Sequence, residues 1–219
     1  MSRLRVIVAA VAAGMLIHVG AAATAPLVAI DPGHGGADVG AVGTIPVGTP
    51  TGLPPRVDPA TGANRIYEKD VNLDVAQRLS TFLQVRGYPT ILTRTQDLAG
   101  GDVPYTTEAA DLQARVAVAE NARANVFVSL HENALAPTTT GTETFHYYYA
   151  TQGSKTLATL IHQRMVAALG LPDRGLQSAG LYALRKSTMP SVPVEGAFLS
   201  NPTEALLLAD PNVRQRIAE

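Results

Sequence analysis

The sequence of 219 residues contains no cysteine and no tryptophan, and only 5% of its residues are aromatic. The absence of cysteine excludes disulfides, zinc fingers and thiol nucleophiles, so any metal ion has to be bound by histidine and carboxylate side chains. An excess of one charge is also absent, because 17 Lys and Arg residues balance 18 Asp and Glu residues. A chain without a basic excess and with few aromatic side chains is not expected to bind nucleic acid.

The sequence also lacks an apolar run long enough to cross a bilayer. The longest run, Val6 to Val19, has about 14 residues, whereas a membrane-spanning helix needs about 20. Two arginines precede this run and the small residues Gly20 to Ala25 follow it, which is the order of a secretory signal peptide. We therefore predict a signal peptide over residues 1–25, export, and no stable membrane insertion after cleavage. An uncleaved membrane anchor is the alternative.

After residue 25, short β-rich runs alternate with longer segments of helical periodicity. This alternation predicts a single α/β domain over residues 26–219, with a twisted, mostly parallel sheet flanked by helices. The expected strands are Leu27 to Asp31, Thr90 to Thr93, Val126 to Leu130, Thr144 to Tyr149 and Val192 to Glu195. The expected helices are Val71 to Arg86, Glu108 to Ala122, Ser154 to Leu169 and a last helix capped by Asn201.

The segment Val42 to Arg65 differs from the rest of the domain. It is rich in Gly, Pro and Thr and has little hydrophobic periodicity, so it is predicted to be a long loop between the first strand and the first helix. A loop of this length inside a domain often serves a functional site. A disordered surface insertion is the alternative.

Two histidines lie at the ends of expected strands. His34 follows the first strand within the sequence DPGHGG, and His131 follows the strand Val126 to Leu130. Glycines allow the backbone to adopt positive φ and to approach a ligand closely, although a lone histidine also occurs in ordinary turns. Ligands bind at the carboxyl ends of the strands in an open α/β sheet, so we expect both imidazoles at a common site.

Two carboxylates accompany these histidines. Glu68 precedes the helix that begins near Val71, where the alternative role is a first-turn acid stabilised by the helix dipole. Glu195 ends an apolar strand, where an unpaired carboxylate is unfavourable to bury. Two imidazoles and one carboxylate suit Zn²⁺, and a second carboxylate can act as a general base. The sequence therefore contains the residue types of a zinc hydrolase site at the carboxyl edge of the strands.

Four blocks of the sequence resemble the zinc-dependent N-acetylmuramoyl-L-alanine amidases of the AmiA/AmiB/AmiC and CwlV type. They are IDPGHGG at residues 30–36, EKD at 68–70, SLHENA at 129–134 and VEGAFLSN at 194–201, and Thr93-Arg94 and Arg115 also agree. The resemblance implies that His34, Glu68 and His131 bind Zn²⁺ and that Glu195 is the catalytic carboxylate. It implies hydrolysis of the amide between the lactyl group of N-acetylmuramic acid and L-alanine, in the peptidoglycan of a bacterial periplasm or cell wall.

Other functions remain open at this point. A zinc peptidase acting within the stem peptide would need the same groups, and an inactive cell-wall-binding module would keep the fold without the metal. In some relatives an inserted helix after the second histidine blocks the site until a partner removes it. The segment Glu132 to Gly141 is too short for a stable blocking helix, so we expect that no activator protein is required.

The remaining polar residues near these blocks are expected to be structural. Glu132 is predicted to lie at the polar rim of the site, and His146 to be a sheet or cleft-lining side chain. His162 lies at the flank of the apolar face of its helix and is predicted to be solvated. His18 belongs to the predicted signal peptide.

Overall fold

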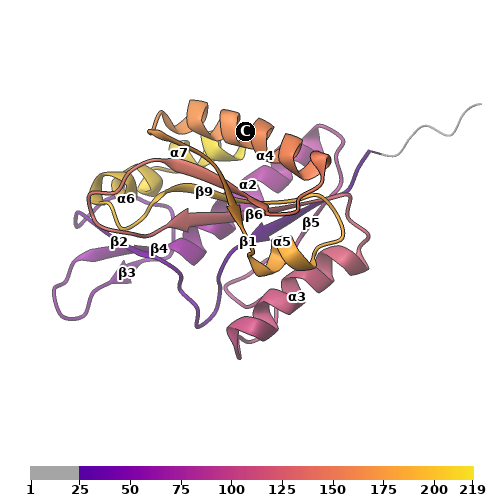
Figure 1. The fold of residues 1–219 in the computed structure, drawn as a ribbon. Helices are drawn as coiled ribbons and strands as arrows, with labels where there is room; N and C mark the ends of the chain where they lie inside the picture. Colours follow the sequence, from indigo (N-terminus) through magenta and orange to yellow (C-terminus); the bar gives the residue numbers. More distant parts are fainter. Residues whose placement is uncertain (1–24) are drawn as a thin grey trace, which may run out of the picture.

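The computed structural model describes residues 25–219, so the predicted signal peptide lies almost entirely outside the described residues (Figure 1). The strands are β1 (Val28–Pro32), β2 (Val42–Ile45), β3 (Arg56–Val57), β4 (Asn64–Tyr67), β5 (Thr90–Leu92), β6 (Val126–Asn133), β7 (Thr142–Tyr147), β8 (Asp173–Ala179) and β9 (Ser191–Phe198). The helices are α2 (Glu68–Val85), α3 (Glu108–Asn121), α4 (Gln152–Leu169), α5 (Tyr182–Lys186), α6 (Pro202–Ala209) and α7 (Pro211–Ala218). None of these helices combines the length and the apolar character that crossing a bilayer demands.

The main sheet has six strands in the order β5-β1-β6-β9-β7-β8. Strands β5, β1, β6 and β9 run parallel to one another, and β7 and β8 run parallel to each other but antiparallel to β9. The predicted α/β domain with a mostly parallel sheet is confirmed. The carboxyl ends of β1, β6 and β9 therefore meet at one edge, and the first residues of β7 and β8 lie beside them.

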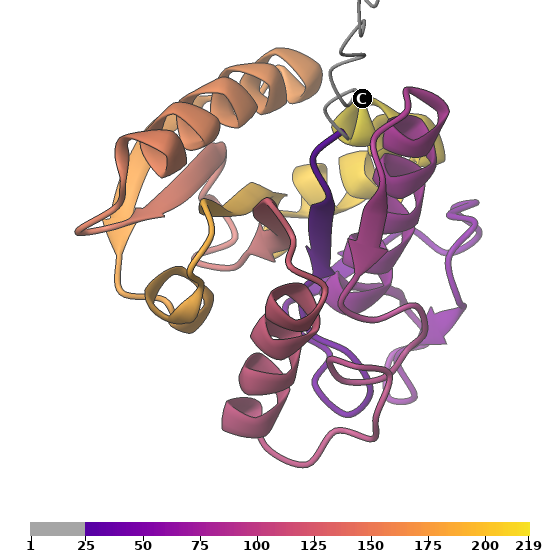
Figure 2. The ribbon, with the colours of Figure 1, turned by 90° about the vertical axis from the view of Figure 1, so that its right-hand side faces the viewer.

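Helices cover both faces of this sheet, with α3 and α5 on the side opposite to α4 and α7 (Figure 2). Alternating residues of the strands face the two layers, as the period of two in a strand requires. In β1, Ile30 packs in the larger core with residues of α2, α4, α6 and α7, whereas Ala29 packs with Phe127 in the smaller core beside α3. The central strands of the sheet are thus buried on both faces, and their residues are free to carry functional groups only near the strand ends.

The prediction of a long loop over Val42 to Arg65 is wrong in part. Strands β2 and β3 pair with β4 in a second, antiparallel sheet of order β2-β4-β3. The strands are short, and Ile45 and Ile66 are their two buried large side chains. A pattern with so few apolar residues does not reveal strand alternation in the sequence. Because β4 leads directly into α2, this small sheet fixes where α2 begins.

Candidate metal centre

His34 occupies a strained position directly after β1. Its φ is 61°, in the left-handed region that residues other than glycine rarely adopt. The buried Arg115 donates a hydrogen bond to the His34 carbonyl and so stabilises this conformation. The ring Nδ1 hydrogen-bonds to Asp38 Oδ2 at 2.8 Å. When Nδ1 donates to Asp38, Nε2 keeps its lone pair and can bind a metal ion.

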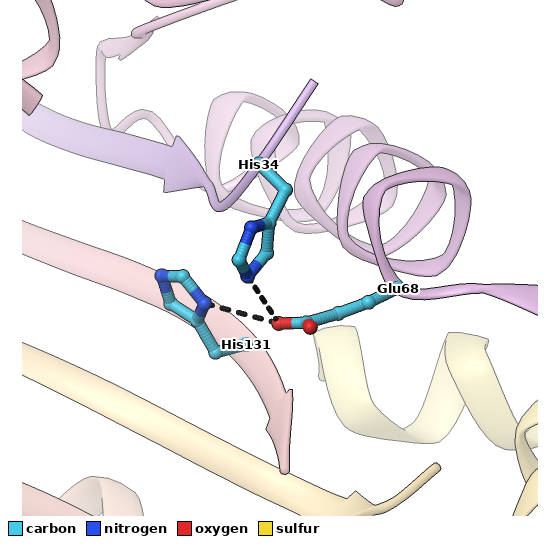
Figure 3. A group of neighbouring side chains, drawn as sticks. All are labelled: His34, Glu68 and His131. Atoms are coloured by element: carbon cyan, nitrogen blue, oxygen red, sulfur yellow. Dashed lines mark hydrogen bonds and ion pairs between the residues drawn. The ribbon is translucent and has the colours of Figure 1, made fainter. Parts of the chain in front are cut away.

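Glu68 is the first residue of α2 and lies between the two histidines (Figure 3). Its Oε1 is 3.0 Å from His34 Nε2 and 3.0 Å from His131 Nδ1. Its other oxygen, Oε2, accepts a hydrogen bond of 2.7 Å from the Ala41 amide, which fixes the carboxylate orientation. Burial alone would raise the pKa of Glu68, but the two histidines hold it far below its usual range. The carboxylate is therefore ionised and aimed at both imidazoles.

The three side chains meet the spatial requirement for a common metal ion. One ligand atom from each of His34, Glu68 and His131 lies within 4.8 Å of the others. Burial lowers the pKa of His34, but Glu68 and Asp38 raise it to about 9. Burial likewise lowers and Glu68 raises the pKa of His131, with a raised value as the net result. The raised pKa values mean that the carboxylates around the two imidazoles stabilise positive charge there. The same carboxylates stabilise a divalent metal ion, which replaces the protons on the ligating nitrogens when it binds.

Glycines make this close approach possible. A Cβ atom on Gly33 would lie 2.1 Å from Cε1 of His131, so any side chain there would displace the imidazole. Gly40 has a φ of 66°, and a Cβ atom on it would lie 2.5 Å from Oε2 of Glu68. Gly33 and Gly40 are therefore needed for side-chain packing, and Gly40 for backbone conformation as well.

Glu195 lies beside the three potential ligands, on β9. It is the register partner of His131 in β6 and of Glu143 in β7. Burial raises the pKa of Glu195 to about 7, with His131 opposing this rise and Glu68 and Glu143 adding to it. A carboxylate with a pKa near neutrality can both accept and donate a proton at physiological pH. The four residues singled out in the sequence are thus neighbours in the fold.

Comparison with known proteins agrees with this geometry. The family model described as N-acetylmuramoyl-L-alanine amidase, Amidase_3, matches residues 28–219. The chain belongs to this family. The resemblance predicted from the four sequence blocks is therefore confirmed.

Comparison with individual amidases of the family shows how much of each protein's length the chain covers. The chain is 35% identical over 192 residues to the N-acetylmuramoyl-L-alanine amidase LytC of Bacillus subtilis, covering 87% of this chain but 33% of LytC. The catalytic domain of CwlV, an amidase from Bacillus (Paenibacillus) polymyxa var. colistinus, is 33% identical with a TM-score of 0.68, covering 88% of this chain and 92% of that domain. An amidase from Clostridium difficile 630 is 31% identical with a TM-score of 0.71, covering 89% and 91%. The chain thus spans about a third of LytC and nearly all of an amidase catalytic domain.

Glu132 is not at the rim of the candidate site, and that prediction is wrong. The strand β6 continues past Leu130 to Asn133, and its alternation turns Glu132 toward the face opposite to His131. The side chain is buried, and its Oε2 accepts a hydrogen bond of 2.7 Å from the Ala197 amide. Burial raises the pKa of Glu132 well above its usual value, and the nearby Glu68 and Glu195 raise it further. Burial therefore favours the protonated form of Glu132.

His162 is also buried, whereas the sequence predicted a solvated side chain. Its Nδ1 lies 3.1 Å from Oγ1 of Thr144 in β7, and its Nε2 lies 2.8 Å from Oδ1 of Asp173 in β8. The flank of α4 that carries His162 is covered by β7 and β8, and β8 was not among the expected strands. His146 lies on β7 outside the metal cluster, as predicted.

Two buried arginines support the loop that carries His34. Arg94 donates to the carbonyls of Pro32, Gly33 and Lys69, and Arg115 donates to those of Pro32 and His34. The sequence comparison with amidases pointed to both arginines but gave them no role. Asp38 was missed altogether, although its position four residues after His34 in a glycine-rich turn is a usable signal. These residues hold the first histidine in place without being ligands themselves.

Proposed function

We propose that the protein is a zinc-dependent amidase that hydrolyses the bond between the lactyl group of N-acetylmuramic acid and L-alanine of the peptidoglycan stem peptide. The observation that carries this proposal is the convergence of His34 Nε2, Glu68 Oε1 and His131 Nδ1 beside Glu195, in a chain of the amidase family. Two imidazole nitrogens and one carboxylate oxygen form a donor set that Zn²⁺ accepts, and three protein ligands leave a further position for substrate chemistry. When bound, zinc supplies the Lewis acidity that amide hydrolysis at neutral pH requires.

The residues of the chain supply the proton transfers and the orientation. Glu195 accepts a proton from the attacking water and then donates it to the leaving amine of L-alanine. Burial raises the pKa of Glu195 above its usual value, which favours both steps. Asp38 orients the His34 ring, and the Ala41 amide orients the Glu68 carboxylate. No covalent intermediate with the protein is needed.

The central experiment measures products and metal content together. Purified protein is incubated with peptidoglycan with and without a chelator, and new L-alanine amino termini are counted while the glycan is checked for intact chains. We expect new amino termini without the chelator and none with it. Cleavage at other positions of the peptide would instead identify a zinc peptidase, and a protein that binds no zinc would identify an inactive wall-binding module.

Variants separate the ligand role from the proton-transfer role. His131→Ala should lose both zinc and activity, because two remaining ligands form a weak site. Glu195→Gln should keep zinc and fold but lose activity, since a general base acts on the transition state. Glu108→Gln, at the first turn of α3, is a matched control that should change neither. Full activity of Glu195→Gln would contradict the mechanism.

We propose further that the protein is exported and acts without an activator protein. Residues 1–25 have the order of a signal peptide, and mass spectrometry of secreted protein should find an amino terminus near Pro26. The short connection between β6 and β7, residues 134–141, contains no helix. The lone, zinc-loaded protein should therefore hydrolyse peptidoglycan. Negligible activity that rises when residues 42–65 are shortened would show instead that this segment inhibits.

A further inference from the structure

A row of charged side chains continues from the metal centre across the sheet. It runs through His131 on β6, Glu195 on β9, Glu143 on β7 and Arg174 on β8, which are four neighbouring strands. His131 pairs in register with Glu195, and Glu195 with Glu143, so these side chains share one face. The pairing of β7 with β8 shifts by one residue between Thr142 and Thr144, which brings Arg174 to the level of Glu143. Arg174 Nε donates a hydrogen bond of 3.1 Å to Glu143 Oε2.

The guanidinium group of Arg174 is held on one edge and free on the other. Glu143, which binds its Nε, is itself fixed by a hydrogen bond from Asn133 Nδ2 to Oε1. Arg174 Cζ lies 5.0 Å from the centre of the Phe198 ring, and its side chain crosses Gly141, where a Cβ atom would lie 2.8 Å from Cγ and Cδ. Neither Nη atom donates a hydrogen bond to any of residues 25–219, and 37% of the side chain is exposed. The outer N–H groups are thus pre-oriented for a ligand.

Such a guanidinium selects a carboxylate, because its paired N–H donors match the two oxygens of that group. The acidic Glu195 and Glu143 repel an anionic substrate, so binding of a carboxylate in this row requires Arg174. N-acetylmuramic acid carries no charge apart from its lactyl carboxyl, and that carboxyl is itself part of the amide. A carboxylate in the substrate therefore belongs to the stem peptide.

The spacing of the strands gives the reach along that peptide. Neighbouring strands lie about 4.8 Å apart, so Arg174 on β8 is about 10 Å from Glu195 on β9, two strands away. A peptide extends about 3.3–3.6 Å per residue, so about 10 Å corresponds to about three residues beyond the scissile amide. Free carboxylates occur within this distance, at the second residue of the stem and, where the third residue is a diamino dicarboxylic acid, at the third.

We propose that Arg174 is a specificity-determining residue that binds a carboxylate of the leaving stem peptide, so that the enzyme favours peptides with a free carboxylate over amidated ones. This inference rests on the proposed amidase function. Glu143, Asn133 and Phe198 act as positioning residues for the guanidinium.

The test uses the zinc-loaded protein and soluble muramyl peptides in three forms: both carboxylates free, only the second residue amidated, and only the third residue amidated. We expect one of the two amidations to raise KM about tenfold, as the loss of a charge-assisted hydrogen bond predicts, with kcat changed less than twofold. The amidation that has this effect identifies the carboxylate that Arg174 binds. Equal KM values for all three substrates would overturn the proposal.

Variants then assign the effect to the residue. Arg174→Gln should raise KM for the free peptide about tenfold and abolish the discrimination, whereas Arg174→Lys should retain part of it. Arg164→Gln, which removes the same charge from an exposed position of α4, should leave all three KM values unchanged. Zinc content and thermal melting should match the wild type in each variant. The proposal would be overturned if Arg174→Gln still discriminated between free and amidated peptides, or if it raised KM equally for both. A different result would contradict the amidase function itself: a wild-type protein that releases no L-alanine amino termini from any peptide.

Discussion

Replacing Arg115 with methionine tests how the fold supports the His34 loop. Arg115 is 2% exposed, and it donates from Nη1 to Asp31 Oδ1 at 2.8 Å and from Nε to Asp111 Oδ2 at 2.9 Å. Both carboxylates are buried as well. Methionine keeps an unbranched side chain but has no donors, so the variant leaves two buried carboxylates without their cation. The substitution removes the charge pairing together with the volume of the guanidinium group.

The expected loss of stability is large. Removing one partner of a buried ion pair lowers the free energy of unfolding by about 3–5 kcal/mol, because the remaining charge is left uncompensated. A domain of this size loses about 2–4 °C in Tm per kcal/mol, so the Tm should fall by about 6–20 °C. Arg164→Met, at an exposed position of α4, is the control and should melt within about 2 °C of the wild type.

The pH dependence distinguishes lost charge pairing from lost packing. Burial alone would raise the pKa of Asp31, but Arg115 and the hydroxyls of Ser129 and Thr93 hold it below its usual value. In the wild type this carboxylate stabilises the fold above the unfolded pKa of about 3.9, and the contribution is lost as the pH falls through the lower folded pKa. In Arg115→Met the pKa of Asp31 rises, so acid protonates it and relieves the penalty.

The assay is urea unfolding of the metal-free wild type and Arg115→Met at pH 7, 5.5 and 4. The gap between their free energies of unfolding should be widest at pH 7 and should narrow toward pH 4. A gap of the same size at all three pH values would refute the electrostatic argument and attribute the effect to packing. A gap below about 1 kcal/mol at pH 7 would refute the assigned role of Arg115 altogether.

Three further outcomes follow from the site. Glu195 must be ionised to accept a proton, so kcat/KM should fall as the pH is lowered through the pKa of Glu195. Burial raises this pKa to about 7 in the metal-free protein, and bound zinc lowers it, so the midpoint of the pH profile should lie below 7. Glu132→Gln should gain stability relative to the metal-free wild type as the pH is raised from 4 to 7, because the unfolded wild type ionises Glu132 in this range whereas burial disfavours the ionised form in the fold. Gly33→Ala should weaken zinc binding in a chelator competition while circular dichroism stays native, because its Cβ would lie 2.1 Å from His131 Cε1; unchanged zinc affinity would contradict this packing argument.

The sequence predicted which side chains meet at the candidate site better than it predicted their surroundings. His34, Glu68, His131 and Glu195 could be found because each follows or precedes a strongly apolar strand or a helix start. Which strands lie side by side, and that β7 and β8 run opposite to β9, could not be read from local patterns. The four side chains are adjacent only because β1, β6 and β9 pair in the observed order.

The predictions of strands and of side-chain burial were wrong where a segment contains few apolar residues, or where a strand extends beyond its run of apolar residues. Strand β8 contains a single large apolar residue, Leu176, and alternates between half-buried and exposed positions, so it gives no strong signal. Without β8, the burial of His162 could not be foreseen. Glu132 was misplaced because the apolar run ends at Leu130 while hydrogen bonding continues the strand to Asn133. In each case, tertiary pairing outweighed the local sequence pattern.

The reversal of strand direction between β9 and β7 divides the site into two modules. The residues proposed to bind the metal and to move protons come from the loop after β1 and from α2, β6 and β9, whereas Arg174 and Glu143 come from β8 and β7, which lie together at one edge of the sheet. Strand β8 has β7 as its only neighbour in the sheet, so its exposed residues can vary without a direct effect on the pairing of β1, β6 and β9. If Arg174 selects the stem peptide as proposed, substitutions at exposed positions of β8 can change the peptide preference while the residues proposed for hydrolysis stay the same. Exchanging these exposed residues between two family members would then transfer the peptide preference without changing the candidate metal centre.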